Sequence, residues 1–354
     1  MSARILMKGN EAVCEAAIRA GCRYFFGYPI TPQNEIPEYM SEKMPKVGGV
    51  FLQAESEVAA INMVYGAAGA GGRVMTSSSS PGMALKQEGI SYIAGAELPC
   101  VIVNMMRGGP GLGSIQPGQA DYFQATRGGG NGDYRHIVYA PASIQEMVDI
   151  LMESFDMADK YRIPVLVLGD GMIGQMMEAV EFKEVDLKEL PQKDWITTGT
   201  KEKRKPNVIN SLYLEPELLY EHNLRLEAKH RLIEENEVRY EAVGLEDAEV
   251  VCVAYGTTSR VVKNAIEELE KEGIKVGLIR PITLWPFPNE AFDKINPKAK
   301  GLLTVEMSMG QMIDDVKIAS NGRWTTDFHG KAGGLVPSPA GVIEAVKKII
   351  GGGK

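Results

Sequence analysis

Two apolar stretches decide the fold: Val-Ile-Val-Asn-Met at residues 101–105 and Val-Leu-Val-Leu at residues 165–168. Nearly continuous apolar runs of this length are typical of strands in a parallel sheet, because helices cover both faces of such a sheet. Around them, short apolar runs alternate with segments of helical periodicity. This alternation predicts an α/β domain with a doubly wound parallel sheet over residues 1–185.

The expected elements of this domain follow from the same periodicities. Strands are expected at residues 5–7, 24–28, 51–53, 74–76, 101–105, 137–139 and 165–168. Helices are expected at residues 11–20, 56–70, 83–94 and 143–161.

The character of the sequence changes between residues 186 and 245, which we interpret as a charged connector. Residues 201–241 contain eight Lys or Arg and nine Glu among 41 residues. Apolar residues recur near helical spacing within 215–242, which predicts an amphipathic helix there. A solvated helical arm and an arm that binds a partner both fit this pattern.

A second, smaller α/β unit is predicted over residues 246–354. Its expected strands are residues 250–254, 275–279 and 302–305, and its expected helices are residues 259–272 and 339–350. A length of 354 residues agrees with two domains, at roughly 150 residues per domain.

Composition excludes several classes of function. The net charge of −8 has the wrong sign for a protein that grips nucleic acid. The most apolar stretch, residues 98–106, is too short to span a bilayer, and residues 1–10 lack the apolar core of a signal peptide, so we expect a cytoplasmic protein without a membrane partner. The four cysteines and four histidines show no metal-ligand spacing, so no metal site is expected.

Two candidate site residues lie where a predicted strand meets a helix. Thr31 belongs to Gly-Tyr-Pro-Ile-Thr-Pro at residues 27–32, which places it at the strand edge where open α/β sheets bind ligands. Thr31 could also cap the following helix, and the two interpretations are compatible. Glu57 lies at the next such junction. An acid there is either exposed and stabilised by the helix dipole, or drawn into an interface by the small residues behind it.

Two loops complete the candidate set. The run Ser-Ser-Ser-Ser-Pro-Gly at residues 77–82 offers hydroxyls and free backbone N–H groups to a polar ligand. Arg107 ends the strongest predicted strand and precedes Gly-Gly-Pro-Gly, so it is suited to bind a carboxylate, although an ion pair with a structural acid also fits. Gly-Asp-Gly at residues 169–171 imitates a diphosphate and magnesium motif, but the paired asparagines of that motif are missing, which favours a simple turn.

Taken in order, these four segments resemble the alpha-type subunit of the 2-oxoacid:ferredoxin oxidoreductases. The resemblance covers essentially the whole chain. It is greatest to the branched-chain 3-methyl-2-oxobutanoate (2-oxoisovalerate):ferredoxin oxidoreductases, and the 2-oxoglutarate enzyme is the alternative. The chain departs from the family at residues 78–82, where a hydroxyl replaces a glycine of the usual Thr-Ser-Gly-Pro-Gly loop.

The resemblance implies an enzyme subunit that needs partners. The first domain would meet the aminopyrimidine ring of thiamine diphosphate, and the second would resemble a transketolase C-terminal domain. A beta-type subunit would hold the diphosphate, Mg and an iron–sulfur cluster, and gamma-type and ferredoxin-like subunits would complete the complex. The complex would convert a 2-oxo acid and coenzyme A into acyl-CoA and CO2, with the electrons passing to ferredoxin.

The same resemblance assigns roles to individual residues. Glu57, Thr31 and Arg107 would be catalytic: Glu57 would hydrogen-bond the aminopyrimidine ring, Arg107 would bind the substrate carboxylate and Thr31 would orient the substrate. Tyr28 would shape the substrate pocket. Residues in contact with the cofactor would be Glu57, Ser79, Ser80, Pro81 and Gly82. Two other classes of function stay open: a non-catalytic assembly subunit, and a thiamine diphosphate enzyme without redox partners.

Overall fold

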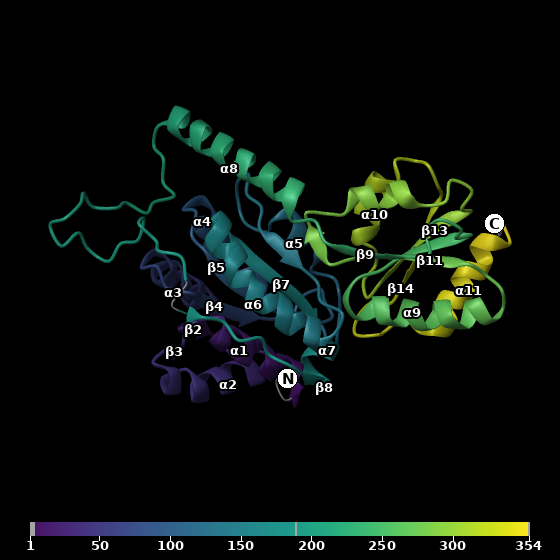
Figure 1. The fold of residues 1–354 in the computed structure, drawn as a ribbon, viewed down its shortest axis with the longest axis horizontal. Helices are drawn as coiled ribbons and strands as arrows, with labels where there is room; N and C mark the ends of the chain where they lie inside the picture. Colours follow the sequence, from purple (N-terminus) through teal and green to yellow (C-terminus); the bar gives the residue numbers. More distant parts are fainter. Residues whose placement is uncertain (1–3, 188–189, 353–354) are drawn as a thin grey trace.

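The computed structural model describes residues 4–187 and 190–352. The predicted first domain, connector and second domain include residues 1–3, 188–189 and 353–354, which lie outside the described residues. Two helix-covered sheets lie one after the other along the long axis of the molecule (Figure 1). This confirms the predicted α/β class. In the described part of the chain, no helix is both long and apolar enough to cross a membrane.

The first sheet has seven strands. In order across the sheet they are β12 (Thr283–Trp285), β6 (Ile137–Tyr139), β7 (Pro164–Asp170), β5 (Cys100–Met106), β4 (Val74–Ser78), β2 (Tyr24–Gly27) and β3 (Val50–Gln53). All neighbours are parallel except β12 and β6. β5 and β7 pair over seven residues each, and every residue of both is buried, as their apolar sequences predict.

Helices cover both faces of this sheet, because right-handed crossovers in opposite directions place helices on opposite sides. They are α1 (Gly9–Arg19), α2 (Glu35–Lys43), the short helix η1 (Pro45–Val47), α3 (Glu57–Gly69), α4 (Ser80–Gly95), α5 (Tyr122–Arg127), α6 (Ile144–Tyr161) and α7 (Gly171–Gln175). α3 packs against α4, whereas α1 packs against α2 and α6. A small antiparallel ribbon joins β1 (Ile5–Lys8) to β8 (Met177–Val180).

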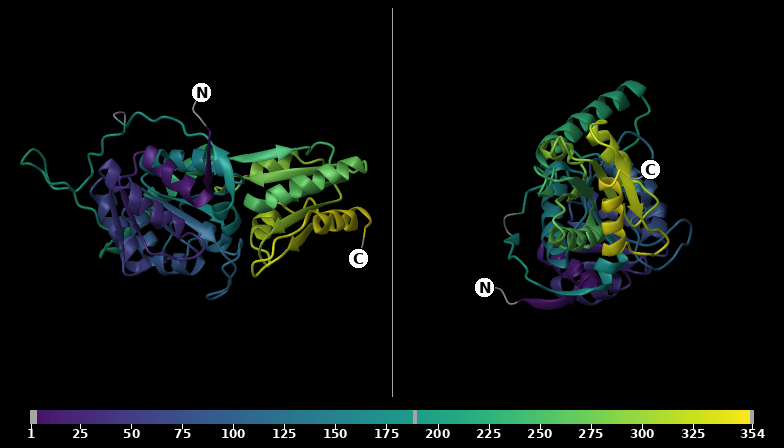
Figure 2. Two further views of the ribbon diagram at one scale, coloured as in Figure 1. Left: turned by 90° about the horizontal axis from the view of Figure 1, so that it is seen from below. Right: turned by 90° about the vertical axis from the view of Figure 1, so that its right-hand side faces the viewer.

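The predicted connector contains one long helix, α8 (Pro216–Asn236). It buries His222, Leu226, His230 and Ile233, while several of its leucines are exposed. The chain before it forms a long loop that stands away from the first domain at the end opposite the second sheet (Figures 1 and 2). A helix within residues 215–242 is thus confirmed, and the last residues of that range belong to a strand, Tyr240–Val243.

The second sheet has five strands, in the order β14 (Thr326–Gly330), β13 (Gly301–Glu306), β10 (Val250–Val253), β11 (Val276–Pro281) and β9 (Tyr240–Val243). Its helices are α9 (Gly256–Lys271), η3 (Asn289–Lys294), α10 (Met312–Ser320) and α11 (Pro339–Ile350). β10 and β13 are buried along their whole length, as expected for the centre of a helix-covered sheet.

Each sheet carries one antiparallel edge strand that the sequence did not predict. β9 runs antiparallel to β11, and β12 crosses back from the second domain to pair with β6 of the first sheet. Mixed sheets commonly end on such a strand. The crossing of β12 ties the two domains together, and all three of its residues are buried.

Candidate active site at the carboxyl edge of the first sheet

Three of the four candidate segments follow neighbouring parallel strands of the first sheet. The Thr31 turn follows β2, the serine run spans the end of β4, and Arg107 follows β5 directly. Because parallel strands have their carboxyl ends at one edge, these segments converge there. The fourth residue, Glu57, is the first residue of α3, which packs against α4 beside this edge.

Arg107 and Thr31 are in direct contact. The Arg107 side chain donates from Nη1 to the main-chain oxygen of Thr31 and from Nη2 to that of Leu112, each at 2.9 Å. Its Nε is buried without a hydrogen-bond partner, and among the described residues it makes no ion pair. Arg107 therefore forms no direct ion pair with a structural acid, although its charge acts on the buried carboxyl group of Asp121.

Thr31 does not cap a helix. α2 begins at Glu35, and the residue before it, Asn34, occupies the cap position. Asn34 Nδ2 instead donates to the hydroxyl of Thr31 at 3.4 Å. The Gln33 side chain also fixes this turn. Its Nε2 donates to the main-chain oxygen of Tyr28 at 3.3 Å, and its Oε1 accepts a hydrogen bond from the Ser77 hydroxyl at 2.5 Å. Thr31 is thus held at the ligand-binding edge, as its first interpretation requires.

The serine run is shorter as a loop than its sequence suggests. β4 extends through Ser78, α4 begins at Ser80, and only Ser79 lies between them. The hydroxyls of Ser78 and Ser79 are buried without hydrogen-bond partners. Pro81 and Gly82 form the first turn of α4. Buried polar groups normally have hydrogen-bond partners, so these two hydroxyls at a helix start are exceptions that need an explanation.

Ser80 is engaged within the protein. Its hydroxyl donates to Asp121 Oδ2 at 2.7 Å and accepts the Arg107 main-chain N–H at 3.0 Å. Asn104 also donates to Asp121, at 2.9 Å. Burial raises the pKa of Asp121, although these two bonds act in the opposite direction. Ser80 therefore holds the Arg107 loop against α4. Ser80 is the residue that replaces the family's glycine, and its hydroxyl has a structural role.

Glu57 is buried, with 7% of its surface exposed, so the interpretation of an exposed acid is wrong. Its helix is capped by Ser56, whose Oγ accepts the Ala59 N–H at 3.2 Å. Within the described part of the chain, the Glu57 carboxylate makes no hydrogen bond or ion pair of its own. A methyl group at Gly82 would lie 2.5 Å from Glu57 Oε1 and would collide with Ser78 Oγ, so only glycine permits this approach.

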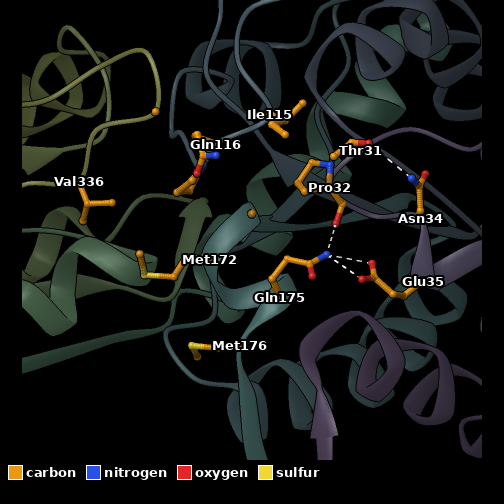
Figure 3. A pocket seen from close by; sticks show the side chains of 13 residues that line it. Thr31, Pro32, Asn34, Glu35, Ile115, Gln116, Met172, Gln175, Met176 and Val336 are labelled. Carbon is orange, nitrogen blue, oxygen red and sulfur yellow. Dashed lines mark hydrogen bonds between the residues drawn. The ribbon is translucent and has the colours of Figure 1, made fainter.

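A cleft of about 650 Å³ opens beside Thr31, between the two domains (Figure 3). Thr31 and Pro32 form one wall, Met172 and Gln175 of α7 form another, and Val336 faces them from the second domain. Gln175 donates to the Pro32 main-chain oxygen at 2.9 Å, which fixes the shape of this wall. The lining contains apolar and amide side chains and one acid, but no Lys or Arg.

Other predicted residues have simpler roles. Tyr28 is 36% exposed at the start of the Thr31 turn and does not line the cleft. Asp170 of the Gly-Asp-Gly run caps α7 by accepting the N–H groups of Met172 and Ile173, at 2.9 and 3.2 Å, so this run is the simple turn that we expect. No group of three or more His, Cys, Asp or Glu among the described residues is arranged to hold a metal ion.

Two supporting residues escaped the sequence analysis. Gln119 is fully buried and bonds the Arg107 loop to the second domain, through Tyr255 O at 3.0 Å and Met307 N at 2.9 Å. Lys86 is fully buried beneath the serine run. Gln119 carries no local signal. Lys86 falls four residues after Gly82 in a predicted helix, where a lysine is usually exposed.

The unpartnered groups fit the ring end of thiamine diphosphate. An aminopyrimidine ring offers nitrogens and an amino group, which match a free carboxylate at Glu57 and free hydroxyls at Ser78 and Ser79. Gly82 leaves the space between them open.

Comparison with known proteins assigns both domains to families. The profile of the family described as pyruvate flavodoxin/ferredoxin oxidoreductase, thiamine diphosphate-binding, matches residues 15–242. The profile of the pyruvate:ferredoxin oxidoreductase core domain II matches residues 248–342. The chain therefore combines a domain of the thiamine diphosphate-binding family with a core domain II of the same class.

Individual relatives make the assignment more specific. The ketoisovalerate oxidoreductase subunit VorB of Methanothermobacter marburgensis is 51% identical over 98% of both chains. The 2-oxoglutarate synthase subunit KorA of Methanocaldococcus jannaschii is 36% identical over 96% of this chain and 98% of its own. A solved structure, the 2-oxoglutarate:ferredoxin oxidoreductase of Magnetococcus marinus, is 28% identical with a TM-score of 0.85. The match covers 99% of this chain and 66% of the solved chain.

The chain belongs to the 2-oxoacid:ferredoxin oxidoreductases, as an alpha-type subunit. This confirms the resemblance seen in the sequence. Its relatives are subunits of oxidoreductases, so this chain works as part of an enzyme complex.

Proposed function

We propose that this chain is the alpha-type subunit of an enzyme that oxidatively decarboxylates 3-methyl-2-oxobutanoate. The products are the branched acyl-CoA and CO2, and the electrons pass to ferredoxin. The observation that carries the proposal is the convergence of Glu57, Thr31 and Arg107 on one sheet edge, with Arg107 bonded directly to Thr31 at 2.9 Å. The 51% identity to ketoisovalerate oxidoreductase subunits supports the choice of substrate.

In this proposal Glu57 holds the aminopyrimidine ring by a hydrogen bond, from its position against Gly82. When bound, thiamine diphosphate would supply a nucleophilic carbon and an electron sink for the decarboxylation. Ser79 and Pro81 line the approach to the ring, and Ser80 keeps the Arg107 loop in place. Tyr28 lies at the start of the Thr31 turn, outside the lining of the cleft, so its role in shaping the pocket stays a prediction.

Arg107 binds the carboxylate of the 2-oxo acid. Two of its N–H groups already donate to main-chain oxygens, and Nε is buried without a partner. A carboxylate that approaches Nε would satisfy this donor, and the charge on both groups would strengthen the bond. The Thr31 hydroxyl lies on the neighbouring turn, from which it orients the same substrate.

The apolar cleft beside Thr31 favours a branched side chain over a second carboxylate. Met172, Met176, Ile115 and Val336 line it, and no basic side chain is present to pair with a carboxylate (Figure 3). Burial of a carboxylate without such a partner is unfavourable. The relation to 2-oxoglutarate synthase subunits makes 2-oxoglutarate the second candidate substrate.

The remaining parts of the reaction belong to other subunits in this proposal. A beta-type subunit holds the diphosphate, Mg and an iron–sulfur cluster, and gamma-type and ferredoxin-like subunits carry electrons onward. We also propose that the complex works in the cytoplasm.

The test is the anaerobic reduction of ferredoxin or a viologen dye by the co-purified complex. Coenzyme A is supplied, and 2-oxoisovalerate, 2-oxoglutarate and pyruvate are offered in turn. We expect the highest kcat/KM with 2-oxoisovalerate. A preference for either other acid would retain the reaction and reject the substrate, whereas no reduction with any of them would favour an assembly subunit. The complex with Glu57→Gln measures background reduction.

A further inference from the structure

Lys86 occupies an unusual position for a lysine. Its side chain is fully buried on α4, where Nζ donates to Thr76 Oγ1 at 2.5 Å and to the main-chain oxygen of Ser77 at 3.0 Å. Across residues 4–187 and 190–352 it has no ion pair within 4 Å. An ammonium group buried among neutral acceptors is costly unless an opposite charge lies near.

Glu57 is placed to supply that charge. Lys86 follows Gly82 by four residues on α4, so both lie on one face of the helix. The Glu57 carboxylate, from α3, contacts this face at Gly82. Lys86 reaches Ser77 from within the core, while Ser78, the next residue of β4, lies beside Gly82 and Glu57. The two opposite charges therefore flank one short segment at the end of β4.

We infer that Lys86 is a positioning residue for Glu57, because its charge holds the buried carboxylate against Gly82 and facing the place of the aminopyrimidine ring. This inference rests on the proposed function. It adds a buried lysine, contributed by α4, to the residues that prepare the carboxylate for the cofactor.

The surroundings of Lys86 agree with this role. Burial lowers the pKa of Lys86 to about 7, and the charge of Glu57 acts in the opposite direction. The titratable groups that act on Lys86 are Glu57 from α3 and Cys100 from β5. Burial raises the pKa of Cys100 to about 12, so this thiol is neutral at neutral pH. Glu57 is therefore the group that opposes the effect of burial on the pKa of Lys86.

The first test measures the coupling between the two residues without cofactor. Urea unfolding of the full chain at pH 6, below the pKa of Lys86, is compared for wild type, Lys86→Met, Glu57→Gln and the double variant. We expect each single variant to lower the midpoint and the double variant to recover part of the loss, since it leaves no buried charge unpaired. Additive effects would overturn the inference. Lys229→Met, which removes a largely buried lysine paired with Glu97, is the matched control and should be additive with Glu57→Gln.

The second test reads the cofactor directly in the assembled complex. NMR follows exchange of the thiazolium C2 proton of bound thiamine diphosphate for deuterium, and titration gives the cofactor Kd. We expect Lys86→Gln, which can still donate a hydrogen bond but has no charge, to slow exchange about tenfold or more with a Kd within about threefold of wild type. Wild-type exchange in this variant would show that Lys86 only fills space, and would overturn the inference.

The two tests separate this inference from the function on which it rests. If the wild-type complex neither binds thiamine diphosphate nor exchanges its proton, the proposed function fails, and the urea comparison still decides whether Lys86 and Glu57 are coupled. If the wild-type complex exchanges the proton and both Lys86 variants do so equally fast, only the inference fails.

Discussion

Arg107 donates a hydrogen bond from Nη1 to the main-chain oxygen of Thr31, 2.9 Å away, although 76 positions separate the two residues in sequence. One guanidinium thus fixes the turn after β2 and the loop after β5 relative to each other. Its buried Nε remains without a partner. The same side chain can therefore support the site and bind a carboxylate.

Replacement of Arg107 should weaken substrate binding more than cofactor binding. Loss of a charge-assisted hydrogen bond costs about 1.5–3 kcal/mol, so Arg107→Ala should raise the KM for the 2-oxo acid roughly 10- to 150-fold. Arg107→Lys should recover little, because lysine cannot reproduce the planar set of donors. Steady-state dye reduction and thiamine diphosphate titration measure the two effects. An unchanged KM would argue against the proposed role, and Arg135→Lys, at a half-buried position outside the lining of the cleft, is the control.

Glu57 should be required for turnover but not for assembly. Glu57→Gln keeps the size of the side chain and removes its capacity to accept a proton, so kcat should fall by about 10²- to 10⁴-fold. Size-exclusion chromatography should show an intact complex. Glu55→Gln alters an exposed acid two residues earlier and should leave kcat unchanged. Normal turnover in the Glu57 variant would remove this residue from the mechanism.

The core of the first domain and the site edge could be predicted because their signals are local. The apolar runs of β5 and β7 identify buried parallel strands, and the ends of parallel strands must share an edge. The same rule places Thr31, after β2, and Arg107, after β5, at one edge of the sheet. Burial of Glu57 could not be decided in the same way, because an acid in a first helical turn is equally compatible with solvent.

The remaining features depend on contacts between distant parts of the chain. β12 is three residues long and pairs with a strand more than 140 residues earlier, so the periodicity of the sequence cannot predict it. Gln119 bonds residues 136 and 188 positions away. The burial of Lys86 could not be predicted, because a lysine in a helix ordinarily indicates an exposed face.

Gln119 should stabilise the junction between the Arg107 loop and the second domain. It is fully buried, its amide bonds Tyr255 O and Met307 N, and its own N–H donates to Met307 O at 2.8 Å. Gln119→Leu keeps the volume but leaves those two main-chain groups unpaired, at about 1–3 kcal/mol each. The free energy of unfolding in urea should fall by about 2–6 kcal/mol. A change under about 0.5 kcal/mol, as expected for the exposed Gln116→Leu, would contradict this account.

His136 should make the fold sensitive to acid. Its side chain is buried, and burial lowers its pKa from 6.5 to about 4. The unfolded chain therefore binds a proton below pH 6.5 that the folded chain accepts only near pH 4. The stability that neutral His136 contributes is fully present above pH 6.5 and is lost as the pH falls toward 4, a change of about 3 kcal/mol.

His136→Phe removes this titration, so the free energy of unfolding of wild type should fall about 3 kcal/mol further than that of the variant between pH 7 and pH 4. Urea unfolding at one-unit intervals of pH measures the two slopes. The slope is the relevant quantity, because the larger ring also changes packing at every pH. Tyr134→Phe alters the ring beside His136, 6.0 Å between centroids, without a titration in this range, so it should keep the wild-type slope. Equal slopes for wild type and His136→Phe would show that His136 is protonated in the folded chain as readily as in the unfolded one.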